Sequence, residues 1–262
     1  MSIAIYEALT FEREMIGGRN TPWLLTVKTE KGLTLYIAKF FVHRDIEQQN
    51  ALSREIYTSV LARELGLSTP DFALITIDEV FKETLPDKLR KALERKHTKF
   101  AFGSKFIPGD HTYTPALLNQ ELAIYDIESI FAFDVLVLNV DRRKKKPNIL
   151  LGSDHYYLID HEHTFALPTN DFAPKQLLSQ YRFKNHIFYE VLHRKAKYGH
   201  KPEFGMFREL FHRLKIDILD NYAEELELKG YEADDCLVIK QYLRELKQDI
   251  SYFMNVVEGV IQ

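Results

Sequence analysis

The side chains best suited to chemistry lie between positions 139 and 161. Asp141 is followed by Asn148 seven residues later, and Asp160 ends an apolar run. In phosphoryl transfer, one carboxylate orients or deprotonates the attacking hydroxyl, while an amide oxygen and a second carboxylate hold Mg²⁺ against the nucleotide phosphates. The pattern therefore predicts Asp141 as the group that orients the acceptor, and Asn148 with Asp160 as the metal ligands.

A lysine and a glutamate further upstream extend this pattern. Lys39 and Ile37 alternate with other residues in a β-rich run, so they share one face of the expected strand. Glu55 follows in an expected helix, on a charged surface stripe with Arg54 and Glu64. In a nucleotide site, Ile37 would cover the base, Lys39 would contact the phosphates and Glu55 would fix the Lys39 ammonium.

A glycine-containing loop precedes the strands. It consists of Gly17, Gly18, Arg19 and Asn20, and lies just before Trp23, where the first strand is expected. Glycine tolerates backbone conformations that let N–H groups approach a phosphate closely. The loop is therefore a candidate phosphate site, although an ordinary turn explains two adjacent glycines equally well.

The chain divides into a strand-rich part and a helical part. Residues 1–107 are expected to form a β-rich lobe and residues 108–262 a mainly helical lobe, so the fold class is α+β with two lobes in one domain. Ligand clefts commonly form at such a junction. Segment 102–107 would connect the lobes, and the backbone of Ser104 and Phe106 within it would hydrogen-bond the edge of an adenine base.

Hydrophobic periodicity predicts the elements that position these groups. Leu52, Ile56 and Val60 recur every four residues and indicate a helix over about 48–65 that ends before Gly66. Segment 127–138 is apolar nearly all round, which is typical of a buried helix. The other expected elements are strands over 23–27, 33–41, 72–77 and 100–107, an exposed insertion over 79–99, a hairpin over 149–159, helices after 168 and a long terminal helix over 234–257.

The composition restricts the class of protein. The formal charge of −3 argues against bulk electrostatic capture of nucleic acid or an anionic membrane. One cysteine, Cys236, excludes an intramolecular disulfide framework and a cysteine-rich zinc site. The N-terminus lacks the pattern of a signal peptide, and no uncharged run reaches the roughly 18–20 residues that span a bilayer. We therefore expect a cytoplasmic protein with no membrane partner.

Two charged stretches allow further interpretations. The basic run 142–146 is expected to be mostly solvated, but beside Asp141 it would favour an anionic acceptor or stabilise the transferring phosphoryl group. Nucleic-acid binding through this run is the least favoured alternative. His161 and His163 permit a zinc site, yet no cysteine or third histidine lies nearby in sequence, so we expect His161 to support the Asp160 loop by hydrogen bonding.

The motifs resemble the HipA-like kinase family, a bacterial branch of the protein-kinase-like and phosphatidylinositol-kinase-like fold. The resemblance rests on Asn139-Val-Asp-Arg142, Lys146-Pro-Asn148 and Ile159-Asp-His161, and it extends from about Gly17 to Phe165. It implies a bilobal kinase-like fold, ATP and Mg²⁺ as cofactors, and transfer of the γ-phosphate to a hydroxyl group.

The chain departs from that family in two motifs and in length. Lys146 stands where the short group of the family often has Asn, and the phosphate loop has only two adjacent glycines. The chain is much shorter than full HipA-type toxins, so a toxin role, an antitoxin partner and DNA binding do not carry over. The acceptor remains open between a protein Ser/Thr, a small alcohol and an inositol-like headgroup. A nucleotide-binding pseudokinase that acts as an interaction module, and an AMP transferase, are the alternative functions.

Overall fold

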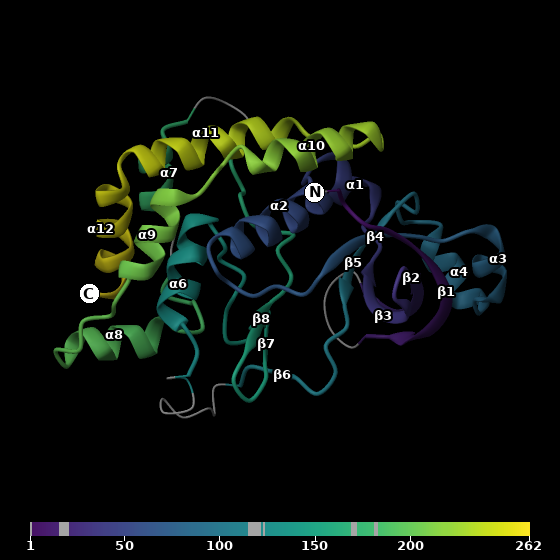
Figure 1. Cartoon of the computed structure of the whole chain (residues 1–262), viewed down its shortest axis with the longest axis horizontal. Coiled ribbons are helices and arrows are strands. Elements are labelled where there is room, and N and C mark those ends of the chain that lie inside the picture. The colour runs from purple at the N-terminus through teal and green to yellow at the C-terminus, as the bar shows by residue number, and fades with distance from the viewer. Residues whose placement is uncertain (1, 16–20, 115–121, 123, 169–171, 181–182) are drawn as a thin grey trace.

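The computed structural model describes residues 2–15, 21–114, 122, 124–168, 172–180 and 183–262 (Figure 1). Five strands close into a barrel in the order β1-β2-β3-β5-β4. The pair β1–β4 is parallel and the other pairs are antiparallel. Closure removes free strand edges from this part of the protein. The barrel strands are β1 (Ile5–Glu14), β2 (Trp23–Thr29), β3 (Gly32–Lys39), β4 (Phe72–Thr76) and β5 (Ala101–Lys105).

The barrel interior determines which way β3 presents its side chains. Tyr36 and Ala38 are buried in the barrel core beside Trp23 of β2. Because side chains alternate along a strand, Ile37 and Lys39 lie on the opposite, outer face. The prediction that these two residues share a face of one strand is therefore confirmed.

A strand precedes the first one that the sequence predicted. β1 pairs with both β2 and β4, but two register shifts, between Ala8 and Thr10 and between Phe11 and Arg13, interrupt its ladder with β2. Most of its residues are exposed or half-buried. The strand predicted at 23–27 is therefore confirmed as β2, but the prediction that it is the first strand is wrong, since a strand with two register shifts carries no clear alternation.

Helix α2 (Ala51–Glu64) lies between the barrel and the helical part of the molecule (Figure 1). It ends before Gly66, whose φ of +74° suits glycine, as predicted. The expected helix over 48–65 starts later, because the short helix α1 (His43–Glu47) precedes it. The predicted insertion over 79–99 forms α3 (Glu79–Thr84) and α4 (Asp87–Leu93).

The insertion is not fully exposed. Phe81, Leu89 and Leu93 belong to the same buried cluster as the barrel core. Their burial fixes α3 and α4 against the barrel, at the end of the molecule remote from the helical part (Figure 1).

The remaining elements include α6 (Ile127–Leu136), in which nine of the ten residues are buried. This confirms the predicted buried helix. A small sheet with strand order β6-β7-β8 lies between α6 and the barrel (Figure 1). Within the described ranges, no helix combines the length and apolar character needed to cross a bilayer. Besides α6, the part of the chain after the barrel contains β6 (His111–Thr112), β7 (Ile149–Leu151), β8 (Tyr156–Leu158), α7 (Pro174–Gln180), α8 (Tyr189–Lys197), α9 (Gly205–Arg213), α10 (Ile218–Leu228), α11 (Asp234–Gln248) and α12 (Ile250–Ile261).

The single terminal helix predicted over 234–257 is wrong, because α11 and α12 are separate. The chain leaves the helical conformation at Asp249, where φ is −121° and ψ is 61°. The Asp249 carboxylate then accepts a hydrogen bond from the Tyr252 N–H at 3.1 Å and caps α12. Aspartate is a preferred residue at a helix N-terminus because it satisfies an otherwise unpaired N–H group.

Candidate functional site

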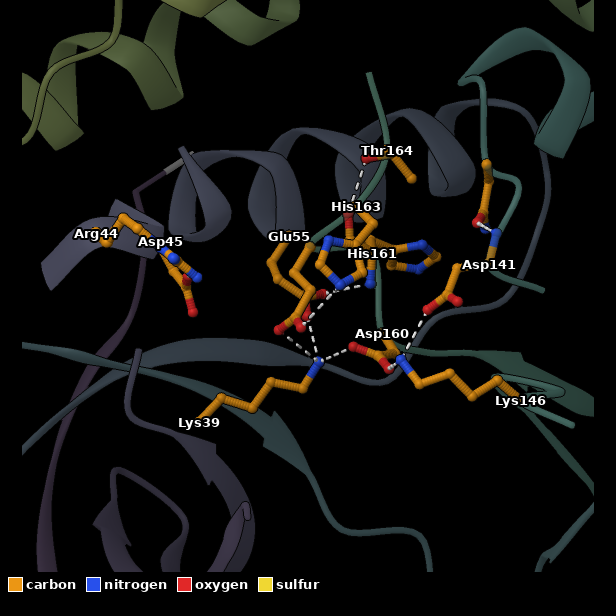
Figure 2. Close-up of polar contacts among 12 residues, drawn as sticks. Lys39, Arg44, Asp45, Glu55, Asp141, Lys146, Asp160, His161, His163 and Thr164 are labelled. Atoms are coloured by element: carbon orange, nitrogen blue, oxygen red, sulfur yellow. Dashed lines mark hydrogen bonds and ion pairs between the residues drawn. The ribbon is translucent and has the colours of Figure 1, made fainter. Parts of the chain in front are cut away.

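Three distant segments of the chain meet at Lys39. The Lys39 ammonium donates a hydrogen bond to Glu55 Oε1 and a second, of 2.5 Å, to Asp160 Oδ1 (Figure 2). Lys39 ends β3, Glu55 lies in α2, and Asp160 follows β8, 121 residues after Lys39. The structure therefore brings together three of the residues predicted from sequence.

Glu55 is buried, which corrects the prediction that it lies on a charged surface stripe with Arg54 and Glu64. Its side chain is 1% exposed. Oε1 accepts from Lys39, and Oε2 accepts a hydrogen bond from the His161 N–H at 2.9 Å. Helix α2 is buried along most of its length, so Glu55 does not face solvent, whereas Arg54 is half-buried and Glu64 at the end of the helix is exposed.

The charges of this group depend on one another. Burial alone would lower the pKa of Lys39, but the carboxylates of Asp160, Glu55 and Glu162 outweigh it and raise the pKa above its ordinary value. Burial alone would raise the pKa of Asp160, but the Lys39 ammonium holds it at about 2. Lys39 and Asp160 are therefore both charged at neutral pH.

The carboxylates outnumber the lysine that they surround. One oxygen each from Glu55, Asp160 and Glu162 lie within 4.8 Å of one another. Burial raises the pKa of Glu55 to about 7, despite the attraction of Lys39 and with the added repulsion of Asp160 and Glu162. Oxygen ligands with excess negative charge suit a hard divalent cation such as Mg²⁺. Glu162 was not among the predicted ligands, although its position two residues after Asp160 is the signal that would have identified it.

Asn148 lies next to the segment that carries Asp160. It precedes β7, and its carbonyl accepts hydrogen bonds from the Ile159 N–H at 3.1 Å and from the Arg142 guanidinium. The Asn148 side-chain nitrogen is buried and has no hydrogen-bond partner among the described residues. Asn148 and Asp160 both have positive φ, 48° and 63°. Non-glycine residues rarely adopt this conformation, and it is concentrated at functional sites.

Asp141 is connected to Asp160 through the ammonium of Lys146. Its N–H donates to Asn139 Oδ1 at 3.1 Å, which fixes the backbone. Asp141 Oδ2 accepts a hydrogen bond of 2.8 Å from the Lys146 ammonium, which is also 3.9 Å from Asp160 Oδ2. Arg143 Nη2 is 3.4 Å from Asp141 Oδ1. Two cations of the basic run therefore contact the predicted acceptor-orienting carboxylate.

A buried network that the sequence analysis missed supports the loop over residues 139–148, which we call the Asp141 loop. Asp134 of α6 is fully buried and accepts hydrogen bonds from Arg142 Nε at 2.6 Å, His186 Nε2 at 2.8 Å and Asn139 Nδ2 at 2.8 Å. Burial alone would raise the pKa of Asp134, but Arg142 and His186 hold it at about 2. The sequence signal for this network was an aspartate inside an apolar helix. Such an aspartate is expected to be buried, and a buried charge must be paired.

The basic run is therefore only partly solvated. Arg142 is fully buried and Lys146 is one-third exposed, whereas residues 143–145 are exposed. The expectation of a solvated run is correct for residues 143–145 and wrong for Arg142, which lies inside the Asp134 network.

Segment 102–107, which was predicted to connect the lobes and contact the base, belongs largely to a strand of the barrel. Residues 102–105 belong to β5, where Ser104 pairs with Ile37 of β3. The Phe106 N–H donates to the Leu35 carbonyl at 2.9 Å. This N–H group is therefore already bonded within the barrel, and a contact of the Phe106 backbone with a base stays a prediction. A contact of Ser104 or Ile37 with a nucleotide stays a prediction.

Two other predictions concern the phosphate loop and zinc. Gly17, Gly18, Arg19 and Asn20 lie outside the described residues. His161 is 1% exposed, and neither ring nitrogen has a hydrogen-bond partner in the described part of the chain. It supports the Asp160 loop through its main-chain N–H rather than its ring. Among the described residues, the carboxylate group able to hold a metal contains no histidine, which gives the zinc alternative no support.

Comparisons with known proteins identify the family of the chain and a solved structure with a similar fold. The model of the HipA-like kinase family matches residues 11–205. Among solved structures, the crystal structure of a Helicobacter pylori proinflammatory kinase, CtkA, has a similar fold with a TM-score of 0.51 and 13% sequence identity, over 97% of this chain and 98% of that chain. No curated protein sequence matches at a significant level. Because the family match spans most of its length, the chain belongs to the HipA-like kinase family.

Proposed function

We propose that the protein is an ATP- and Mg²⁺-dependent phosphotransferase that moves the γ-phosphate to a hydroxyl group. The observation that carries this proposal is the contact of Lys39 with both Glu55 and Asp160. Residues 1–107 and 108–262 would act as the two lobes of one kinase-like domain, with the nucleotide between them.

The carboxylates and the lysine would divide the work of binding. Asp160 and Asn148 would hold Mg²⁺, with Glu162 as a further oxygen ligand, and bound Mg²⁺ would neutralise charge on the phosphates. Lys39 would contact the phosphates, and Glu55 would hold the Lys39 ammonium in position. These groups are fixed by hydrogen bonds before the nucleotide binds, so little reorganisation is needed.

Asp141 would orient the acceptor. The acceptor oxygen attacks the γ-phosphorus, the bond from that phosphorus to the bridging oxygen breaks, and ADP leaves. The hydroxyl proton passes to the Asp141 carboxylate. Arg143 lies 3.4 Å from Asp141 and is exposed, so an acceptor with a negative charge near its hydroxyl is favoured. A protein Ser/Thr with acidic neighbours, a small alcohol that carries an anionic group and an inositol-like headgroup with a phosphate would each meet this description.

The test is Mg²⁺-dependent turnover of ATP labelled on the γ-phosphate, with water or the protein itself as acceptor. Asp141→Asn is expected to lower turnover by roughly 10²–10⁴-fold, because a positioned base contributes about that much. The affinity for ATP should stay within a few-fold. The matched control is Asp154→Asn, since that carboxylate is 87% exposed in a hairpin turn and should leave turnover unchanged.

Two results would contradict the proposal. ATP binding without turnover by the wild type would identify a pseudokinase that acts as a binding module. Incorporation of label from the α-phosphate, with release of pyrophosphate, would identify AMP transfer instead.

A further inference from the structure

Lys146 stands between two carboxylates of the candidate site. Its ammonium is 2.8 Å from Asp141 Oδ2 and 3.9 Å from Asp160 Oδ2. Figure 2 shows Lys39 and Lys146 approaching Asp160 from opposite sides, one from the barrel and one from the Asp141 loop. Each oxygen of Asp160 therefore faces a different lysine.

The backbone holds Lys146 in this place. Arg143 and Lys146 exchange two main-chain hydrogen bonds, of 2.9 Å and 2.8 Å, which close a four-residue turn. Pro147 follows and restricts Lys146 to an extended conformation. The side chain is 33% exposed, whereas residues 144 and 145 at the tip of the turn are exposed. The turn therefore directs one of its lysines into the site.

The two lysines divide the carboxylates into two groups. Lys39 contacts Glu55 and Asp160, with Glu162 at 3.9 Å, and this side has three carboxylates for one ammonium. Lys146 lies between Asp141 and Asp160, and Arg143 adds a second cation there. The first side keeps excess negative charge and the second does not. A divalent cation is therefore attracted to the first side, whereas on the second side the two cations balance the two carboxylates and offer it no such attraction.

We infer that Lys146 takes the place of a metal ion between Asp141 and Asp160, so that the site binds one Mg²⁺ and uses the Lys146 ammonium as its second cation. This inference rests on the proposed function. Two ions are used in many phosphoryl-transfer sites, where they neutralise charge on the transferring group. A lysine supplies one positive charge at a single point and needs no ion from solution. Lys146 would thus contact the γ-phosphate.

The first experiment counts metal ions without turnover. Mn²⁺ is titrated into the protein with a non-hydrolysable ATP analogue, and bound Mn²⁺ is measured by electron paramagnetic resonance. We expect one Mn²⁺ per wild-type chain and one in Lys146→Arg, which keeps the charge. Lys146→Asn, which removes the charge and offers an amide oxygen, should bind a second Mn²⁺. The control Lys31→Met changes an exposed lysine in another turn and should bind one.

The outcomes separate this inference from the proposed function. Two Mn²⁺ ions in the wild type, or one in a folded Lys146→Asn variant, would overturn the role of Lys146 and leave the nucleotide site in place. If the analogue does not bind to the wild type at all, the proposed function fails first. Thermal unfolding of each variant shows whether the protein is folded.

The second experiment measures ATP turnover. Lys146→Met should lower kcat by roughly 10–100-fold, with the affinity for the nucleotide changed by less than about threefold, because the contact forms with the transferring group. Lys31→Met should match the wild type. A rise in kcat in Lys146→Met would show that Lys146 blocks Asp141 rather than assisting transfer, and would overturn the inference.

Discussion

At the scale of single residues, Asp134 determines the shape of the Asp141 loop without facing the site. It lies in α6, and its carboxylate binds Arg142, His186 and Asn139 together. Arg142 in turn donates to the Asn148 carbonyl. One buried charge therefore links the loop that carries Asp141 to the residue predicted to bind the metal.

Asp134→Asn should be strongly destabilising. The substitution leaves Arg142 buried without its counter-charge, and breaking a buried pair in this way costs about 3–5 kcal/mol. Urea unfolding at pH 7 measures the loss. The control Asp154→Asn removes an exposed carboxylate and should change the free energy of unfolding by less than about 0.5 kcal/mol. An equally small loss of unfolding free energy in Asp134→Asn would contradict the claim that this network stabilises the protein.

The same carboxylate predicts a dependence on pH. The pKa of Asp134 is held at about 2 in the folded protein, below its ordinary value of 3.8. Its contribution to stability is therefore present above pH 3.8 and is lost as the pH falls toward 2. By linkage this contribution is about 2 kcal/mol. The difference in unfolding free energy between the wild type and Asp134→Asn should shrink by that amount between pH 5 and pH 2, and a constant difference would refute the argument.

At the scale of elements, the closure of the barrel depends on a close approach between β4 and β5. Gly103 of β5 lies opposite Ala73 of β4 and Ala38 of β3. A Cβ atom at position 103 would lie 2.5 Å from Ile75 Cγ1 and 3.2 Å from the Ala73 carbonyl oxygen. Small residues on three neighbouring strands therefore allow the sheet to close, with Lys39 at the end of β3.

Two glycine substitutions should have opposite effects on stability. Gly103→Ala overpacks the barrel and should lower the free energy of unfolding by about 1–3 kcal/mol. At Gly259 in α12, an added Cβ atom would have no neighbouring atom within 4 Å. Gly259→Ala should therefore raise the free energy of unfolding by up to about 1 kcal/mol through helix propensity. Chemical unfolding of both variants gives the comparison. A neutral Gly103→Ala would show that the strands separate easily.

At the scale of the whole molecule, the candidate site joins the barrel to the helical part. Lys39 comes from a barrel strand and Asp160 from the far side of the junction, and α2 lies between the two parts (Figure 1). A nucleotide that contacts both Lys39 and Asp160 would hold the two parts together. Binding at this junction should therefore stabilise the whole chain against unfolding.

This expectation is tested by thermal unfolding with ATP, with and without Mg²⁺. A ligand at a hundredfold excess over its Kd adds about 2.7 kcal/mol, which is a rise in Tm of several degrees for a chain of this size. Asp160→Asn should remove the part of the shift that depends on Mg²⁺, and Asp154→Asn should retain it. No shift in any protein at millimolar ATP would remove the support for a nucleotide site.

The sequence by itself determined the elements with regular patterns and the polar residues at their ends. The helix that ends before Gly66, the buried helix α6 and the β7–β8 hairpin follow from local periodicity, which acts within a few turns or strands. The approach of Lys39, Glu55 and Asp160 was also predicted, because each residue type and its order along the chain suit one chemistry. Strand β1 and the break at Asp249 were missed, since an irregular ladder and a single capping residue leave weak local signals.

Only the tertiary structure decided how deeply these charges are buried and which further charges face them. The burial of Glu55, the Asp134 network and the position of Lys146 join residues from separate segments. Sequence spacing describes one element at a time, whereas burial and Coulomb interactions depend on distances between elements that pack together. For this reason the same basic run holds a fully buried Arg142, exposed residues at its tip and a lysine inside the site.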